Sequence, residues 1–423
     1  MSASTRPVPG GAAWLEEQER SLVRFAAGSV VPDGFGHLDA RGGVESGRPT
    51  ATWITARMTH VFSLAHLRGD ADAAALADHG VAALTGPLRD AEAGGWFDEV
   101  PEGGAASVRE RSGTLPGKAA YPHSFVVLAA ASAAHAGRPG ARELLDEALG
   151  VIEEYFWEPS ADCVRESWDA DWTTTESYRG ANSAMHCVEA FLAAADVTGD
   201  TRWVRRAAAI AERLIHGVAA AHDWRLPEHF TPGWEPLPDY NRDRPDHPFR
   251  PFGSTTGHLL EWARLLVHLE KALERAGEPV PGWALTDAEL LFDNAVRRGW
   301  ATDGIDGFVY TLDWEDRPVV RQRMHWVIAE AAMTAWTLGQ RTGKASYSEH
   351  LERWWAYADR FHVDREHGGW RHELDPDGSP AASVWAGRPD VYHPYQAVLL
   401  PQIGLSTSIA AALPADGRNR KHT

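Results

Sequence analysis

The chain has 423 residues, of which 44% are hydrophobic and 24% are charged, so it has the composition of an ordinary globular protein with a large core. Its 41 basic and 59 acidic residues give a formal net charge of -18, which argues against nucleic acid and anionic membranes as partners. The two cysteines, Cys163 and Cys187, support neither a disulfide framework nor a cysteine-based zinc site.

The N-terminus lacks a basic segment followed by an apolar one, and no run of about 18 apolar residues occurs. A cytoplasmic location is therefore expected, without a membrane partner. The chain also holds 19 tryptophans and 20 histidines. Both residue types suit sugar-binding clefts, although tryptophan also fills large cores.

Helical periodicity dominates the chain between loose ends at about residues 1–11 and 415–423, and strand-like alternation is almost absent. The apolar pattern predicts an all-α protein. Its helices are expected over residues 12–28, 51–68, 71–89, 121–136, 139–156, 179–198, 201–219, 255–275, 285–299, 321–342, 345–362 and 392–412.

The turns between these helices carry a repeat. Aromatic hairpins recur roughly every 60 to 80 residues, at 32–36, 94–98, 165–169, 223–228, 303–308 and 368–373. A helix pair of this kind cannot bury its apolar face alone, so such units stack into an open solenoid or close into a ring. The short ends favour closure. The chain is therefore predicted to form one (α/α)6 toroid, or barrel, of six helical hairpins, as a single domain over residues 1–423.

The second helix of each predicted pair opens with Arg, His or Asn. In the stretch 249–262, Ser254, Thr255 and Thr256 are each competent to cap a helix, and His258 then falls in its first turn. The positive end of a helix dipole favours an imidazole in its neutral, base-competent form. In a closed ring these helix starts converge on one mouth of a central pit, which predicts a functional site there.

Histidines with carboxylates one turn away are typical of general acid–base catalysis near neutral pH. Two other kinds of site remain open. The spacings of His258 with Glu261 and of His325 with Glu330 resemble those of metal ligands, although no HExxH motif is present. A glycoside hydrolase would need a pair of carboxylates, for which the candidates are Glu176, Glu189, Glu261 and Glu330.

Several motifs, in order along the chain, resemble the N-acylglucosamine 2-epimerase superfamily. They are Arg57-Met-Thr-His60, Asn182-Ser-Ala-Met-His186, Gly257-His258-Leu-Leu-Glu261-Trp262, His325-Trp326-Val-Ile-Ala-Glu330 and Val391-Tyr-His393-Pro-Tyr. The likeness extends over about residues 12 to 405. It is closest to the sugar isomerase branch, which contains mannose isomerases and sulfoquinovose isomerase, with cellobiose 2-epimerases as more distant relatives.

This resemblance implies an (α/α)6 barrel that acts on free sugars with no metal and no cofactor. It implies a catalytic pair, His258 and His393. It further implies supporting roles for Arg57, His186, Glu261 and Glu330, and sugar contacts by Trp53, Tyr121, Asn182, Trp326 and Trp385.

The favoured hypothesis is the isomerisation of D-mannose to D-fructose. His258, oriented by Glu261, would open the sugar ring, and His393 would remove the C2 proton to give a cis-enediol. Arg57 would stabilise the developing oxyanion, while Trp53 or Trp326 would stack on the sugar. The alternatives are a sugar 2-epimerase, a sulfoquinovose isomerase, and a carbohydrate hydrolase or non-catalytic sugar-binding toroid.

Three points stay open at this stage. Arg250 and Arg323 could bind a sulfonate or hold a loop by ion pairing. The segment 229–253, rich in Pro and Asp, could form a lid or rim over the pit, or a dimer contact. The chain is expected to be a monomer or a homodimer.

Overall fold

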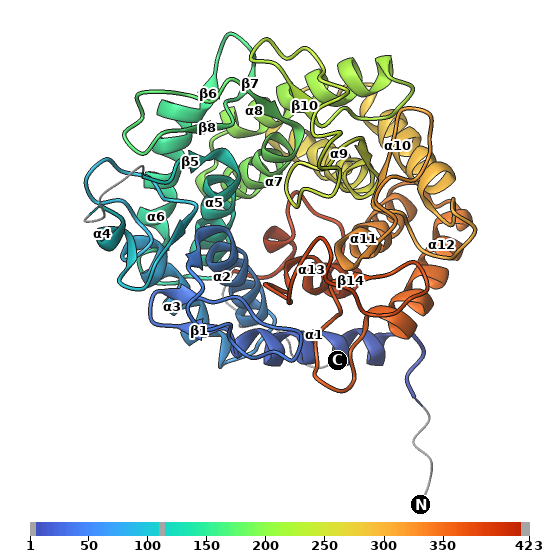
Figure 1. The fold of residues 1–423 in the computed structure, drawn as a ribbon, viewed down its shortest axis with the longest axis horizontal. Coiled ribbons are helices and arrows are strands. Elements are labelled where there is room, and N and C mark those ends of the chain that lie inside the picture. Colours follow the sequence, from blue (N-terminus) through green and yellow to red (C-terminus); the bar gives the residue numbers. More distant parts are fainter. Residues whose placement is uncertain (1–5, 110–114, 416–423) are drawn as a thin grey trace, which may run out of the picture.

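The computed structural model describes residues 6–109 and 115–415, whose helices form two concentric rings around one axis (Figure 1). The inner ring consists of α2 (Thr52–Leu67), α5 (Ala120–His135), α7 (Ala181–Thr198), α9 (Thr256–Ala276), α11 (His325–Thr342) and α13 (Tyr392–Ile403). The outer ring consists of α1 (Ala12–Ala27), α3 (Ala73–Thr85), α6 (Ala141–Val151), α8 (Arg202–Ala211), α10 (Ala284–Gly299) and α12 (Ala345–Tyr357). This is the (α/α)6 barrel that the repeat predicted.

The two ends of the chain close the ring. Among the outer helices, the main neighbour of each of the first five inner helices is the one that follows it in the chain, and α13 packs against α1. The pairing in space is therefore shifted by one helix from the pairing expected along the sequence. Three outer helices continue into π-helical segments, namely η1 (Ile152–Phe156), η2 (Glu212–Ala219) and η3 (Ala358–His362).

The helices differ from the expected ones at several places, including α3, which ends at Thr85 rather than at residue 89. The helix expected over 392–412 ends at Ile403, and the chain then turns at Gly404 before a short 3-10 helix, η4 (Ala410–Ala412). The helix expected from residue 321 begins at His325. A short helix, α4 (Gly104–Arg109), has no counterpart in the prediction. Residues 6–11 lead into α1, and the remainder of the expected loose ends lies almost entirely outside the described residues.

Short antiparallel strand pairs, which the hydropathy pattern did not reveal, connect the repeats. In five of them the first strand directly precedes an inner helix: β3 (Thr50–Ala51) with β4 (Glu99–Val100), β5 (Lys118–Ala119) with β8 (Ser167–Trp168), β9 (Arg179–Gly180) with β10 (His229–Phe230), β11 (Ser254–Thr255) with β12 (Thr311–Leu312), and β13 (Arg323–Met324) with β14 (Glu373–Leu374). Two further pairs are local hairpins, β1 (Val30–Val31) with β2 (Gly34–Phe35) and β6 (Trp157–Glu158) with β7 (Cys163–Val164). Strands of two residues are too short to produce an alternating pattern.

The inner helices are buried on nearly every face because the outer ring covers one side and the interior of the barrel covers the other. Tryptophan serves the core as well as the pit: Trp14, Trp96, Trp262, Trp354 and Trp370 are among the largest fully buried side chains. Within the described part of the chain, no helix has both the length and the apolar character required to cross a bilayer.

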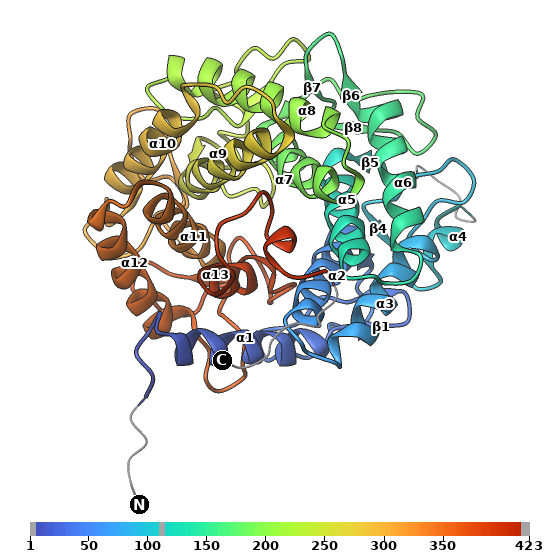
Figure 2. The same cartoon turned by 180° about the vertical axis from the view of Figure 1, so that it is seen from behind.

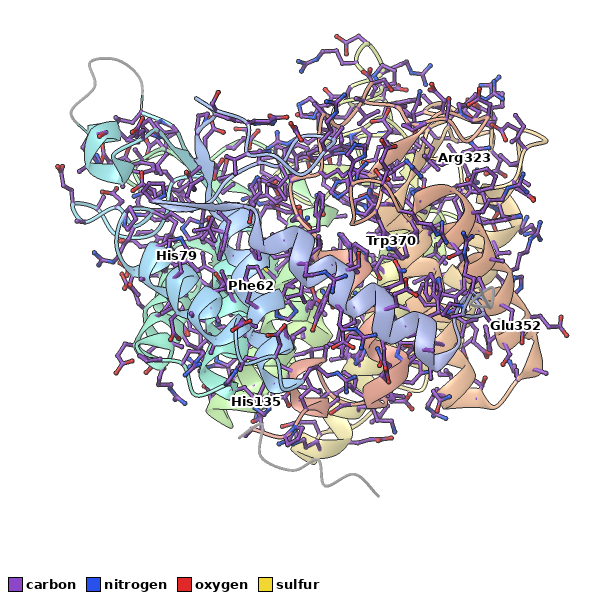
Figure 3. All side chains as sticks on the ribbon, turned by 90° about the horizontal axis from the view of Figure 1, so that it is seen from below. Phe62, His79, His135, Arg323, Glu352 and Trp370 are labelled. Carbon is purple, nitrogen blue, oxygen red and sulfur yellow. The ribbon has the colours of Figure 1, made fainter. Side chains whose placement is uncertain are left out.

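The two ends of the barrel differ. In the side view, Arg323, which precedes α11, lies near the end that carries the short strands, and His135, the last residue of α5, lies near the opposite end (Figure 3). The segment after α13 crosses that opposite end, as the view from behind shows (Figure 2). It is held there by Ser406 O, which accepts from His268 Nδ1 over 2.7 Å, and by Leu413 O, which accepts from His135 Nε2 over 2.9 Å.

Candidate active site

A pocket of roughly 670 Å³ opens at the strand-bearing end of the barrel, where the first turns of the inner helices meet. The predicted catalytic histidines, His258 and His393, both line it. So do three of the predicted supporting residues, Arg57, His186 and Glu261, and all five predicted sugar contacts, Trp53, Tyr121, Asn182, Trp326 and Trp385. Glu330 lies behind His393 and is fully buried.

The strand pairs explain why these helices begin where they do. The first N–H of each of five inner helices donates to a backbone carbonyl of the next repeat, at Asp98, Glu166, Glu228, Tyr310 and His372. This contact satisfies the first unpaired N–H of each of these helices with a backbone acceptor. The helix start expected near Ser254, Thr255 and Thr256 is confirmed, because α9 begins at Thr256, but Thr255 at the N-cap position makes no side-chain capping bond, so that part of the expectation is wrong.

His393 is held by a buried carboxylate. Its Nδ1 donates to Glu330 Oε1 over 2.9 Å. A carboxylate that accepts this bond fixes the hydrogen on Nδ1 and leaves Nε2 with a free lone pair in the neutral ring. Burial lowers the pKa of His393, and Glu330 partly opposes that shift. His393 is thus a neutral imidazole available as a base.

His258 is held in the same way, by Glu228. The distance from His258 Nδ1 to Glu228 Oε1 is 3.0 Å, and the Glu228 side chain is buried. The expectation that Glu261 orients His258 is therefore wrong. Glu261 follows His258 by three residues on α9, but its carboxylate lies close to His186 and Glu189 on α7, and to Glu330 on α11 and His393 on α13.

Glu261 belongs to a polar layer beneath the pocket. Its Oε1 lies 3.8 Å from His186 Nδ1 and 3.6 Å from the Arg264 guanidinium, and neither oxygen has a hydrogen-bond partner among the described residues. Burial, followed by the charge of Glu330, raises the pKa of Glu261 well above its ordinary value. Burial also lowers the pKa of His186 to about 4. This layer therefore contains a neutral carboxylic acid and a neutral imidazole.

Arg57 is the positively charged group that reaches the pocket. Its guanidinium donates to Asp390 Oδ2 over 3.1 Å and to the Tyr121 hydroxyl over 2.8 Å, and its Nε has no partner among the described residues. The guanidinium carbon lies 5.0 Å from the centre of the Trp53 ring. Arg57 is thus fixed by its neighbours at the pocket wall.

Aromatic rings form the walls of the pocket. The Trp326 indole lies between the two histidines, with its centroid 5.2 Å from that of His258 and 5.6 Å from that of His393. At the mouth, the Phe249 ring lies 5.9 Å from Trp53 and 5.0 Å from Trp385. Two histidines therefore flank a flat apolar surface on which one sugar ring can stack.

Several pocket residues escaped the sequence reasoning. Glu228 and His372 lie in the aromatic hairpins at 223–228 and 368–373, at positions that the repeat makes equivalent. The equivalent positions in other repeats hold Asp98, Glu166 and Tyr310, at different places relative to the hairpins, so the repeat by itself did not identify Glu228 and His372. No local signal indicated Asp390, Tyr310 or Phe249, which also line the pocket or hold residues that do.

The segment 229–253 contributes to the rim. Pro248, Phe249 and Pro251 line the pocket mouth. Arg250 points away from the pocket and forms a two-pronged contact with Glu176, at 2.7 and 2.9 Å. This contact removes Glu176 from the group of candidate pit carboxylates.

Arg323 also lies outside the pocket lining, where its guanidinium donates to Asp303 over 2.6 Å. Both arginines that could have bound a sulfonate therefore hold loops instead.

Two groups of described residues have ligand atoms close enough for a metal ion: His186 with Glu189 and Glu261, and Glu261 with Glu330 and His393. The Arg264 guanidinium lies among these carboxylates, 2.9 Å from Glu330 and 3.6 Å from Glu261. An arginine thus already supplies the positive charge that a cation would bring.

The N-acylglucosamine 2-epimerase (GlcNAc 2-epimerase) family model matches residues 34–397. A D-mannose isomerase of Thermobifida fusca is 55% identical over 407 residues, which cover 96% of this chain and 97% of the relative. A D-mannose isomerase of Pseudomonas cannabina pv. alisalensis is 50% identical over 400 residues, covering 95% and 94%. A crystal structure of a D-mannose isomerase superposes with a TM-score of 0.84 at 26% identity, covering 93% of this chain and 98% of that one. The chain belongs to the N-acylglucosamine 2-epimerase family.

Proposed function

We propose that this member of the family isomerises D-mannose to D-fructose through an open-chain sugar and a cis-enediol, without a metal ion. Two relatives of 55% and 50% identity that carry the name D-mannose isomerase support the substrate. The observation that carries the chemistry is the pair His258 and His393: each donates Nδ1 to a buried carboxylate, and both face one pocket.

Ring opening is the first task, because the C2 proton of a cyclic sugar is not acidic. The anomeric hydroxyl must lose its proton, and the ring oxygen must gain one. His258 takes the hydroxyl proton as a base, and the imidazolium that forms transiently, stabilised by Glu228, gives that proton to the ring oxygen as the bond between C1 and the ring oxygen breaks. The product is the open-chain aldose.

Proton transfer between C2 and C1 is the second task. His393 Nε2 removes the C2 proton. The electron pair of the broken C–H bond forms a double bond between C1 and C2, and the carbonyl oxygen at C1 becomes negative. The same imidazolium then returns its proton to C1, while the C2 hydroxyl gives its proton to the negative oxygen at C1, so that C2 becomes the ketone and C1 carries a hydroxyl. Because Glu330 keeps Nδ1 protonated, Nε2 alone exchanges the proton throughout.

Arg57 stabilises the oxygen that becomes negative, since it is the positively charged group in the pocket and is already oriented by Asp390. Trp326 supports the sugar between the two histidines. Each positioned acid or base contributes on the order of 10² to 10⁴ in rate.

A neutral monosaccharide suits the pocket better than an anionic sugar. Among the described residues that line it, Arg57 is the only lysine or arginine, and Asp390 already pairs with it. A sulfonate or phosphate would be buried without a cation of its own, which is costly. This argument disfavours the sulfoquinovose alternative.

The test is incubation of the protein with D-mannose in D₂O, followed by NMR of the sugars. Fructose is the expected product, with deuterium at C1 to the extent that the proton held by His393 exchanges with solvent before it returns. Glucose without fructose would identify an epimerase instead, and unchanged mannose together with cleavage of a glycoside would identify a hydrolase. His258→Asn and His393→Asn should each abolish fructose formation, and turnover above a few per cent in either variant would remove that residue from the mechanism.

Metal dependence is tested on the same reaction. We expect the rate to be unchanged after dialysis against a chelator, because Arg264 neutralises the carboxylates where a cation would bind. A rate that falls with the chelator and returns with one added divalent ion would favour a metal-assisted isomerase at the groups around Glu261.

A further inference from the structure

Arg264 lies beneath the pocket, on α9 and two turns after His258. It is almost completely buried, at 1% exposure. Its Nε donates to Glu330 Oε2 over 2.9 Å, and one terminal nitrogen lies 3.3 Å from the other Glu330 oxygen. Arg264 does not line the substrate pocket and has no part in the proton transfers described above.

Three buried carboxylates surround this single guanidinium. Besides Glu330, Glu261 lies 3.6 Å away and Glu189 lies 3.8 Å away. The Tyr392 hydroxyl donates to Glu189. One positive charge cannot neutralise three negative ones, so the layer must hold protons on some of these groups.

The contacts indicate which carboxylate is ionised. Glu330 accepts from Arg264 and from His393, whereas Glu261 accepts no hydrogen bond among the described residues. A buried carboxylate without donors is the group that stays protonated. Burial alone would raise the pKa of Glu330, but Arg264 and His393 outweigh that effect and lower it.

We propose that Arg264 is a positioning residue for the isomerisation, which acts through Glu330 to keep His393 a neutral base with its proton on Nδ1. The inference rests on the function proposed above for His393. The chain of contacts runs from Arg264 to Glu330 to His393, each over 2.9 Å, so the guanidinium never meets the sugar.

The mechanism of this effect is electrostatic. Glu330 and His393 share a hydrogen bond, so they titrate as a pair. Binding one more proton inactivates the base, whether that proton goes to the carboxylate or to the imidazole. A cation beside the pair opposes this proton uptake, and its removal must therefore move the titration to higher pH.

Other charged and titratable groups face the pair formed by Glu330 and His393, and a substitution of Arg264 leaves all of them in place. They are Arg57 on α2, His186 and Glu189 on α7, Glu261 on α9, His325 on α11, His372 and Asp390 before α13, and Tyr392 on α13.

The experiment is the pH profile of kcat/KM for D-mannose, measured for the wild type and for Arg264→Met. An opposite charge at this distance typically shifts a pKa by roughly 1 to 3 units, so the acid limb of the profile should move to higher pH by about that amount. KM should change little, because Arg264 does not line the pocket. Arg264→Lys keeps the cation and should restore the acid limb towards its original position.

Arg68→Met is the matched control. Arg68 is also a mostly buried arginine in an ion pair, with Glu19 at 3.1 Å, but it lies at the far end of α2. The substitution Arg68→Met should lower the stability of the protein without moving the acid limb of its pH profile. A limb that stays in place in Arg264→Met, or that moves equally in Arg68→Met, would overturn the proposal.

A second comparison remains decisive if Arg264→Met does not fold. The double variant Arg264→Met/Glu330→Gln removes both members of the buried ion pair. If Arg264 acts through Glu330, the double variant should be no slower than Glu330→Gln alone. A further loss of more than about tenfold would show that Arg264 acts by another route. A wild type that makes no fructose would instead refute the proposed function, so the two failures are distinguishable.

Discussion

Glu228→Gln tests the partner of His258 most directly. The substitution keeps the size and shape of a buried side chain but removes its charge. The backbone carbonyl of Glu228, which accepts from Ala181 N over 3.0 Å, is untouched, so the start of α7 should remain in place. The variant therefore isolates the contact between Oε1 and the His258 imidazole.

The magnitude follows from that contact. A hydrogen bond to an ionised group contributes about 1.5–3 kcal/mol. Loss of that amount from the transition state corresponds to a decrease in kcat of roughly 10- to 150-fold. If the amide nitrogen rather than its oxygen faces Nδ1, the imidazole is forced into the wrong tautomer, and the loss can approach about 10⁴-fold.

The assay combines two readings on one NMR sample: the rate of fructose formation from D-mannose and the enzyme-dependent exchange between the mannose anomers. Both should fall together, because His258 acts on ring opening. Glu235→Gln, an exposed glutamate in the following loop, is the control and should match the wild type. Activity within threefold of wild type in Glu228→Gln, with a collapse in Glu261→Gln, would refute the reasoning and return the orienting role to Glu261.

Three further predictions concern the same pocket. In Glu330→Gln, the acid limb of kcat/KM should move to lower pH, because the carboxylate that raises the pKa of His393 is gone; kcat should also fall, and an acid limb at higher pH would contradict this. Gly257→Ala should raise KM for mannose several-fold despite the better helix propensity of alanine, because the new Cβ would lie 2.3 Å from a ring carbon of Trp326; an unchanged KM would show that the indole does not hold the sugar. Phe249→Ala should widen the mouth, so that a disaccharide with a reducing-end mannose gains in kcat/KM relative to mannose; a ratio equal to that of the wild type would show that Phe249 does not exclude larger sugars.

The sequence alone predicted the ring because its repeat is long and its helices are strongly periodic. The repeat also predicted that equivalent helix starts meet at one site when the ring closes, whereas the choice of the ten pocket-lining side chains, with Trp385 before α13 among them, followed from the resemblance to a known family. The sequence failed on the carboxylate behind His258. Spacing along α9 favoured Glu261, three residues away, whereas the true partner comes from the preceding hairpin, 30 residues earlier. A periodic pattern shows which residues share a helix face, but not which loop crosses in front of that face.

The way in which the inner helices begin was also not predictable from local sequence. Ser254, Thr255 and Thr256 satisfy every local rule for a capping residue, yet none caps α9 through its side chain. The required acceptor is a backbone carbonyl at Tyr310, brought there by a two-residue strand pair. Such a short pairing leaves no trace in hydropathy, because every residue has a backbone carbonyl oxygen, whatever its side chain.

Closure of the ring by α1 and α13 determines when the enzyme becomes active during its synthesis. His393 lies on α13, the last inner helix to leave the ribosome, whereas Glu330 and His258 are made much earlier. Glu19 on α1 accepts from Arg68 over 3.1 Å and from Gln402 on α13 over 3.0 Å, and the second of these contacts can form only once α13 has been made. A growing chain can therefore fold hairpin by hairpin and still hold only half of the catalytic pair. The catalytic pair is therefore completed in one step, when α13 packs against α1 and the ring closes.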